Sequence, residues 1–524
     1  MTAALMGFIY GMFLYKAPEK SKSNIKFIIQ LVISSILVLG GIKILIESSF
    51  LNLLYGKAYL AVIASRFTTQ LILFPIQIIT IYALEKALRP FINKYIYTKE
   101  KITIDEYLQD FDKFTKDPNL DAMKYLMKEF NNPQNNFKVI HVAGTNGKGS
   151  ICEMLSNILV EQGYNVGKFI SPHLIKFNDG ICFNNTEITD SDVEEILIPL
   201  SEKITEYNKT HKTPVKWFEA ITSLALIYFA KKECDLVILE TGLGGLTDCT
   251  NIANSIISII ASVGYDHIDI LGNTLEEIAI HKAGIIKPNS DTVFIEQENI
   301  TNIIENTCKE KNAKLHLIKK KDVTNYKYNN EIQSFDYKDY KNIEINLKGN
   351  VQIYNATEAL ECIDILKEKG YKISEQAIRQ SLKTVNHKAR MEILSTNPKI
   401  VFDGGHNENA IKNLKENIQQ YYPDSKKVYI VSILKTKDYK TIIKNLCDDK
   451  EAIFFFTSGN DKKRYLSKHK LYKEAKKYLK DINMYEENIK DAINICKKAY
   501  TDRAILIIGS FYIYKTVREV LKND

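Results

Sequence analysis

The sequence lacks the cysteine pattern of a disulfide-stabilised or zinc-binding protein. Its eight cysteines lie at irregular spacings, and no two of them form a CxxC motif. Small zinc domains use closely spaced cysteine pairs, and disulfide frameworks belong mainly to short secreted chains. We therefore expect reduced thiols in a cytosolic environment. Internal repeats and low-complexity tracts are absent as well, which argues against a solenoid or a long linker.

The larger part of the chain also lacks an excess of charge of one sign. The formal net charge is +8, but residues 1–100 contain 11 Lys and Arg against 4 Asp and Glu, whereas residues 101–524 contain 60 and 59. Proteins that bind nucleic acids present a basic face to the phosphates. The balanced charge of residues 101–524 predicts no nucleic-acid partner.

Long apolar runs are confined to the first hundred residues. Met1–Tyr15 has no charged side chain, and Phe27–Ile42 and Phe67–Leu84 have none either. About 20 mainly apolar residues cross a bilayer, and the last two runs reach that length if Lys43 and Arg66 extend toward the headgroups. The N-terminus has no basic segment of the signal-peptide kind. We predict a membrane segment over residues 1–99 with about three transmembrane helices; buried helices of a soluble domain are the alternative.

The charges around these runs predict their orientation. Four lysines follow the first run and a second basic group follows the third, whereas the loop between the second and third runs has only Glu47 and Lys57. Basic loops remain in the cytosol. Residues after about Glu85 are therefore expected inside the cell. The predicted location is the membrane, with the catalytic domains in the cytoplasm.

From Lys101 onward, short apolar runs alternate with helical patterns such as Ser150–Gln162. Continuous apolar strands separated by helices are typical of parallel sheets covered on both faces. Two such series are separated near Ser381–His387, which predicts an α/β fold: a nucleotide-binding parallel-sheet domain over 101–385 and a smaller C-terminal α/β domain over 386–524. The predicted strands are Lys138–Val142, Leu236–Glu240, Ile256–Ala261, Thr292–Ile295, Ile400–Phe402, Val428–Val431, Ile453–Thr457 and Ala504–Ile508.

A glycine-rich turn joins the first strand to the first helix, with the sequence HVAGTNGKGS at 141–150. Glycines let backbone N–H groups surround phosphate oxygens, and a helix N-terminus favours an anion. Lys148 would neutralise phosphates, and the Ser150 hydroxyl would reach Mg²⁺. The spacing departs from GxxxxGKS because Gly149 separates the lysine from the serine. The residues predicted to bind ATP are Gly144, Thr145, Asn146, Gly147, Lys148, Gly149 and Ser150.

This turn resembles the P-loop of folylpolyglutamate synthases and dihydrofolate synthases, which are related to Mur ligases. Further segments match motifs of that family, in family order. They are SPHL at 171–174, FE at 218–219, ETGLGG at 240–245, DCTN at 248–251, DH at 266–267, LG at 271–272, KAGIIKP at 282–288, NA at 355–356, DGGHN at 403–407 and GS at 509–510. The resemblance implies an enzyme that uses ATP and Mg²⁺ to join L-glutamate to a folate or dihydropteroate.

The chemistry implied by the resemblance is activation of a carboxylate as an acyl phosphate, followed by attack of an amine. Both steps build negative charge that fixed cations must stabilise. The resemblance implies that Ser150, Glu219 and His267 hold one Mg²⁺, and that Lys282 is carbamylated to hold a second. An unmodified ammonium is a donor only and cannot bind a cation. Lys148, His267 and Lys282 are the predicted catalytic residues.

In the second domain, the resemblance implies that Arg390, Asp403 and His406 close over the nucleotide, with Asn355 nearby. Arg390 would bind phosphate, since guanidinium groups match phosphate oxygens. Three positions depart from the family pattern. Leu246 and Gly180 stand where the family has arginine, and His281 stands where it commonly has glutamate. The two missing arginines leave substrate choice and catalytic efficiency open.

The membrane segment resembles the C-terminal half of a folate-specific substrate-binding component of an energy-coupling-factor (ECF) transporter. The matching segments are GFIYG at 7–11, LLYGK at 53–57 and FPIQ at 74–77. This resemblance implies ECF transporter subunits as partners. Either a truncated gene model or a half-transporter serving as a tether explains the missing earlier spans. Two other functions stay open: a Mur-type ligase acting on another carboxylate, and a membrane folate-binding protein with a degenerate ligase domain.

Overall fold

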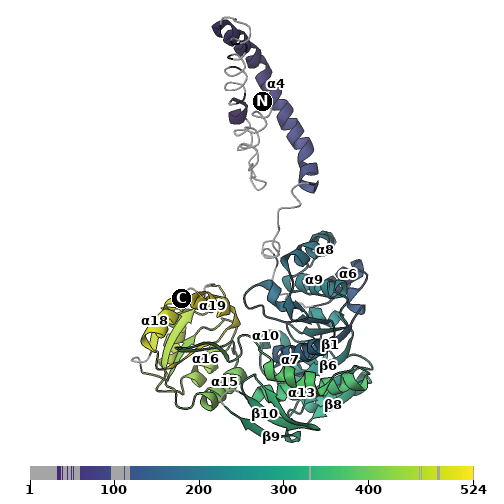
Figure 1. The fold of residues 1–524 in the computed structure, drawn as a ribbon, viewed down its shortest axis with the longest axis vertical. Coiled ribbons are helices and arrows are strands. Elements are labelled where there is room, and N and C mark those ends of the chain that lie inside the picture. Colours follow the sequence, from purple (N-terminus) through teal and green to yellow (C-terminus); the bar gives the residue numbers. More distant parts are fainter. Residues whose placement is uncertain are drawn as a thin grey trace. The chain divides into compact units, whose positions relative to one another are not determined.

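The computed structural model describes residues 32–36, 38, 44, 49, 51, 53, 59–95, 111, 119–329, 332–459, 461, 463–480 and 484–522. The chain divides into two compact units, Met1–Ile102 and Thr103–Asp524 (Figure 1). All three sheets and every predicted site residue belong to the second unit.

The first unit contains the long helix α4 (Tyr59–Tyr95). Its segment Leu60–Thr80, 21 residues long, is the one candidate membrane span among the described residues, by length and composition. The predicted third span, Phe67–Leu84, lies within this helix. Of the predicted second span, Phe27–Ile42, the structure describes only a helical fragment, and the first, Met1–Tyr15, lies outside the described residues. The count of about three transmembrane helices therefore stays a prediction.

The second unit begins with an eight-stranded sheet of order β4-β3-β2-β5-β1-β6-β7-β8. The pairings among β2, β5, β1, β6, β7 and β8 are parallel, and β3 and β4 extend the sheet antiparallel at one edge. The strands are β1 (Lys138–Ala143), β2 (Val166–Phe169), β3 (Ile181–Phe183), β4 (Thr186–Glu187), β5 (Leu236–Glu240), β6 (Ser255–Ile260), β7 (Asp291–Ile295) and β8 (Lys314–Ile318).

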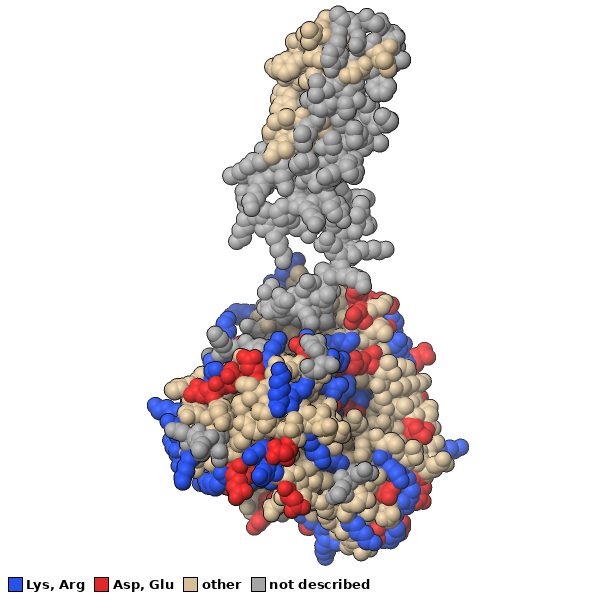
Figure 2. Space-filling model, turned by 60° about the vertical axis from the view of Figure 1, so that its left-hand side comes forward, with Lys and Arg blue, Asp and Glu red and all other residues tan. Residues whose placement is uncertain are grey.

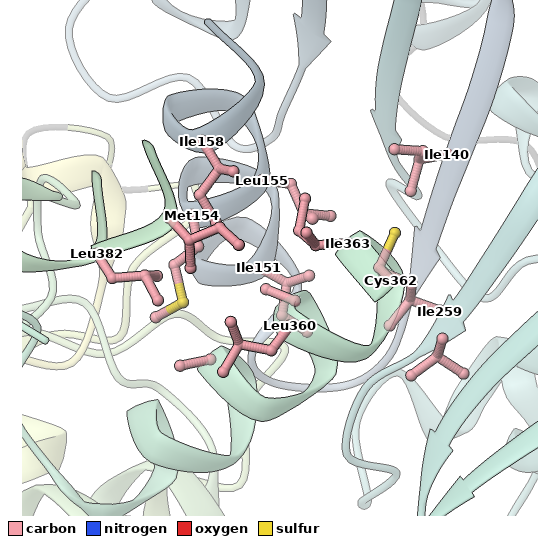
Figure 3. Packing of buried hydrophobic residues seen from close by; sticks show 14 of the residues in the cluster. Ile140, Ile151, Met154, Leu155, Ile158, Ile259, Leu360, Cys362, Ile363 and Leu382 are labelled. Atoms are coloured by element: carbon pink, nitrogen blue, oxygen red, sulfur yellow. The ribbon is translucent and has the colours of Figure 1, made fainter. Parts of the chain in front are cut away.

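Helices cover both faces of this sheet, which explains its continuous apolar strands. On one face, α7 (Lys148–Glu161) packs against α13 (Asn350–Glu368) and α14 (Glu375–Thr384); Figure 3 shows Ile151 and Leu155 of α7 next to Leu360 and Ile363 of α13. The other face is covered by a second buried cluster that includes three helices. They are α6 (Asp121–Glu129), α8 (Asp190–Thr210) and α9 (Trp217–Lys231).

A small antiparallel sheet of order β11-β10-β9 precedes α13, and the sequence analysis did not predict it. Its strands are β9 (Val323–Tyr328), β10 (Gln333–Tyr337) and β11 (Tyr340–Ile345). Strand β9 is mostly exposed, and β10 alternates buried and half-buried side chains. Such polar, half-buried strands give a weaker sequence signal than the buried parallel strands. The remaining helices of this domain are α10 (Ile268–Leu271), α11 (Leu275–Ala283) and α12 (Thr301–Glu310).

The C-terminal part forms a six-stranded sheet of order β12-β13-β17-β14-β15-β16, parallel except for the edge strand β12. Its strands are β12 (Glu392–Thr396), β13 (Lys399–Asp403), β14 (Lys427–Val431), β15 (Ile453–Ser458), β16 (Met484–Asn488) and β17 (Ala504–Ile508). Separate apolar clusters bury its two faces. Its helices are α15 (Glu408–Tyr421), α16 (Tyr439–Leu446), α17 (Lys468–Ala475), α18 (Ile489–Ala499) and α19 (Tyr514–Lys522).

The α/β fold is thus confirmed for residues 119–522, and all eight predicted strands are present within a residue or two of their expected bounds. Acidic and basic side chains are intermixed on the face of this unit drawn in Figure 2, in keeping with its balanced composition. The polar loops that follow β1, β5, β6 and β13 lie at the carboxyl ends of their strands, where ligands of open parallel sheets usually bind.

Candidate active site

The loop Gly144–Gly147 connects β1 directly to the first turn of α7. Gly147 has a φ of +96°, and a Cβ built there would lie 2.5 Å from the Asn355 side-chain oxygen. Only glycine combines this backbone conformation with so close a neighbour. No side chain caps the start of α7, so its first N–H groups stay available to an anion.

The Lys148 ammonium lies over this loop. It donates to the carbonyls of Gly144 (3.1 Å) and Thr145 (3.4 Å) and is 3.9 Å from Glu240 Oε1. These partners are all oxygens, and an ammonium donor at this position could equally neutralise phosphoryl oxygens. The structure places the Lys148 ammonium beside this loop, and its phosphate-binding role stays a prediction.

Glu240, at the end of β5, is the carboxylate that the structure places beside Lys148. Burial raises its pKa to about 7, although Lys148 acts in the opposite direction. Its Oε2 accepts a hydrogen bond from the Ser171 N–H (3.1 Å). The sequence analysis quoted this glutamate in the ETGLGG motif but assigned it no role. Its position at the end of an apolar strand is the sequence feature that could have marked it as a candidate site residue.

Glu219, the predicted metal ligand, has a different environment. Its Oε2 accepts from the Lys216 backbone N–H (2.7 Å) at the start of α9, and burial raises its pKa. This hydrogen bond is a helix-capping contact. The role of Glu219 as a magnesium ligand stays a prediction, and Glu240 is the carboxylate next to the phosphate loop.

The Ser150 hydroxyl makes a hydrogen bond of 3.1 Å with Nδ1 of His387. His387 belongs to the segment between the two sheets, and burial lowers its pKa to about 3. A Cβ built on Gly149 would approach the His387 ring to 2.9 Å, so a glycine is needed between Lys148 and the serine. The sequence analysis missed His387 because the surrounding segment matches the family motif poorly.

After β6, three titratable groups face the same region. His267 has a left-handed φ of +50°, and burial lowers its pKa to about 4, with Asp266 opposing. Lys282, buried in α11, has its pKa lowered by burial to about 7, with Lys148 acting in the same direction. A substantial share of Lys282 is therefore neutral near pH 7, and the neutral amine is the form that reacts with CO₂. The described residues contain no group of three or more His, Cys, Asp or Glu side chains with metal-site geometry.

The second domain contributes Arg390, Asp403 and His406. Arg390 is half-buried, and its guanidinium lies 4.5 Å from the Phe511 ring centre. Asp403 accepts from the N–H groups of Met391 (2.9 Å) and Gly405 (2.8 Å), and burial raises its pKa against the effect of Arg390. His406 Nδ1 bonds to the Gly404 carbonyl (2.9 Å), and burial lowers its pKa to about 3.

An open pocket with an empty volume of about 530 Å³ lies between the phosphate loop and the second domain. Six of the predicted nucleotide-binding residues line it: Asn146, Gly147, Ser150, Asn355, Arg390 and Asp403. The rest of its wall is formed by Lys348, Val351, Gln352, Met391, Ala410, Asn413, Leu414 and Asn417. Residues from both domains, up to 271 positions apart in the chain, thus surround one space beside the phosphate loop.

Two hydrogen-bonded contacts join the domains around this pocket. The side-chain amides of Asn146 and Asn407 pair at 3.1 Å, and the Lys437 ammonium lies 2.6 Å from the Asp266 carboxylate. Neither Asn407 nor Lys437 was singled out as a site residue from the sequence.

The two positions that depart from the family arginines have different surroundings. Leu246 is 46% exposed, and its N–H donates to the His281 carbonyl (2.7 Å). Gly180 is buried, and a Cβ there would overlap the His173 ring. An arginine at 180 is therefore incompatible with His173 in its present position.

A parallel-sheet domain with a phosphate loop, facing a second α/β domain across a shared pocket, defines a ligase of the Mur type. Residues 142–363 match the Mur ligase middle domain, and residues 389–511 match the Mur ligase glutamate ligase domain.

The chain is 33% identical over 422 residues to the dihydrofolate synthase/folylpolyglutamate synthase of Bacillus subtilis, covering 78% of this chain and 96% of that protein. Its structure resembles the folylpolyglutamate synthase of Thermotoga maritima with a TM-score of 0.70 at 30% identity, over 80% of this chain and 96% of that one. It also resembles E. coli FolC in complex with DHPP and ADP, with a TM-score of 0.69 at 25% identity, over 80% and 96% of the two chains. The chain belongs to the folylpolyglutamate synthase/dihydrofolate synthase family.

Proposed function

We propose that this chain ligates L-glutamate to a folate such as tetrahydrofolate, and also to dihydropteroate to form dihydrofolate, at the expense of ATP. The observation that carries the proposal is the pocket shared by both domains next to Lys148 and the glycine loop. The names of its relatives support folate substrates, and the complexes of related proteins with ADP support the nucleotide. An acyl phosphate on the folate carboxylate is the intermediate.

The residues of the phosphate loop have distinct tasks. The loop N–H groups and the Lys148 ammonium hold the triphosphate and compensate the charge that develops on its transferred phosphoryl group. Arg390 of the second domain lines the same pocket, where its guanidinium would add a second fixed cation. Asp403 orients this segment through the N–H groups of Met391 and Gly405.

The donor groups beside Lys148 fit magnesium. A hydroxyl from Ser150 and a carboxylate from Glu240 are hard oxygen donors that would hold Mg²⁺, together with His267. When bound, Mg²⁺ supplies Lewis-acid stabilisation to the phosphoryl oxygens. A buried, partly neutral Lys282 also fits the predicted carbamate, whose carboxylate would hold a second Mg²⁺.

The first unit is proposed to hold the enzyme at a membrane, with the ligase domains in the cytoplasm. The apolar segment Leu60–Thr80 of α4 supports this, together with the basic residues that flank the apolar runs. Resemblance to an ECF transporter component suggests that incoming folate is passed to the ligase. Fractionation of cells that express the full chain and a chain lacking residues 1–99 tests the anchor; equal recovery of both in the soluble fraction would exclude it.

The decisive experiment measures phosphate release from ATP with glutamate and one of three additions: tetrahydrofolate, dihydropteroate or buffer. The proposal expects release that depends on both a folate and glutamate, together with a product one glutamate heavier by mass spectrometry. Release that appears only when a carboxylate precursor of the cell wall replaces tetrahydrofolate and dihydropteroate would point to a Mur-type ligase acting on another carboxylate. The absence of any release would leave a folate-binding protein with a degenerate ligase domain.

A further inference from the structure

A short, largely buried ion pair joins the two α/β domains. Asp266 lies in the loop after β6, and Lys437 lies in the loop between β14 and α16. Their charged atoms are 2.6 Å apart, and the side chains are only 14% and 7% exposed. Both loops leave the carboxyl ends of parallel strands, so this ion pair connects the functional edges of the two sheets.

The Asp266 carboxylate is surrounded by groups of the proposed site. His406 Nε2 of the second domain is 3.8 Å from one of its oxygens, and His267 Nε2 is 3.9 Å from the other. The His267 backbone N–H also donates to Asp266 (2.9 Å). The same ion pair therefore contacts one histidine from each domain.

The loop that carries Asp266 is also bonded to the phosphate loop. Thr145 Oγ1 donates to the Gly264 carbonyl and accepts from the Gly264 N–H, both at 2.9 Å. A Cβ built on Gly264 would lie 2.5 Å from the Asn409 side chain of α15. A short, continuous set of contacts thus runs from the phosphate loop through Asp266 to the second domain.

Burying an ion pair costs desolvation energy, so such a pair is weak evidence for added stability, although losing one partner is costly. A buried ion pair does, however, specify the relative position of the two segments that carry the charges, because each charge requires its partner. We propose that the Asp266–Lys437 ion pair fixes the second domain over the phosphate loop, and that Lys437 is a positioning residue for ligation. This inference rests on the proposed function and adds to it a residue that touches neither the nucleotide loop nor the pocket wall.

The test compares Lys437→Met with Lys437→Arg in the full chain in detergent, with Lys440→Met as the matched control on the exposed face of α16. We expect Lys437→Met to lower kcat by about tenfold or more, while binding of the ATP analogue AMPPCP changes by less than about threefold. Arginine keeps the charge and is expected to retain at least about a third of kcat. A kcat for Lys437→Met within about twofold of the Lys440→Met value would overturn the proposal.

A double-mutant cycle and a distance measurement complete the test. Asp266→Asn is expected to lower kcat as Lys437→Met does, and the double variant is expected to be no worse than either single variant. If the double variant lost kcat by the product of the two single losses, the pairing would be contradicted.

Spin labels at the exposed positions 309 and 490, one in each domain, report the distance between the domains with AMPPCP bound and need no ligase activity. Lys437→Met should lengthen and broaden this distance. An unchanged distance would refute the proposal even if folate-dependent ligation were demonstrated, and failure of the parent chain to ligate would refute only the proposed function.

Discussion

Replacement of Gly147 by alanine tests the phosphate loop with an internal control. Gly147 stands at the start of α7 with φ +96°, and Gly163 stands just beyond its end with φ +97°. A Cβ at 147 would meet the Asn355 oxygen at 2.5 Å, whereas a Cβ at 163 would have nothing within 4 Å. The two substitutions therefore introduce the same backbone strain, but only Gly147→Ala also introduces a close contact, with Asn355.

The shared strain is about 1–2 kcal/mol, the cost of a left-handed conformation for an L-residue. Both variants should lose about this much unfolding free energy. Gly147→Ala must also displace Asn355 or the loop, which removes at least one charge-assisted hydrogen bond to a phosphate, worth about 1.5–3 kcal/mol. The dissociation constant of AMPPCP should rise by about 10- to 150-fold for Gly147→Ala, since 1.4 kcal/mol is tenfold.

The assay is calorimetric titration of AMPPCP into each variant, with urea unfolding to measure stability. Gly163→Ala should bind AMPPCP within about twofold of the parent despite its loss of stability, since it lies at the other end of α7. If the two variants weakened AMPPCP equally, strain alone would explain the effect. The loop around Asn146 would then not be the phosphate site.

Four further substitutions give separate outcomes. Lys148→Ala should reduce folate-dependent phosphate release by about 10³-fold or more, because the phosphoryl group loses its fixed cation; release within tenfold of the parent would exclude this role. Glu240→Gln should raise the Mg²⁺ concentration for half-maximal activity, whereas Glu219→Gln should cost only about 1 kcal/mol of stability through a weaker helix cap; the reverse pattern would restore Glu219 as the ligand. Lys282 has a folded-state pKa of about 7 against 10.5, so the unfolded chain binds more protons between these values and stability rises with pH there. In CO₂-free buffer, Lys282→Met should remove this rise, measured as melting temperature from pH 7 to 10, and an unaltered pH dependence would contradict the buried position.

The elements predicted from the sequence and those missed differ in a physical way. Buried parallel strands such as β5 and β17 are continuous apolar runs, and such runs can be recognised from the sequence without knowing the fold. Strands β9 to β11 carry mixed polar residues and depend on pairing with one another, so their pattern was not distinctive. The membrane segment was predicted from three apolar runs, and the described residues contain one helix of sufficient length.

The sequence by itself determined the phosphate loop, because a glycine-rich turn between an apolar strand and a helix needs only local order. Lys148 and Ser150 follow from that motif. Tertiary structure alone decided which carboxylate lies beside Lys148. Glu219 lies in the first turn of a helix and Glu240 ends a strand 21 positions later, and neither local pattern shows which one approaches the loop. It also brought His387 to Ser150 and Lys437 to Asp266, across 237 and 171 positions. Contacts between distant segments depend on how two sheets pack against each other, and that packing is set by the whole core rather than by any short motif.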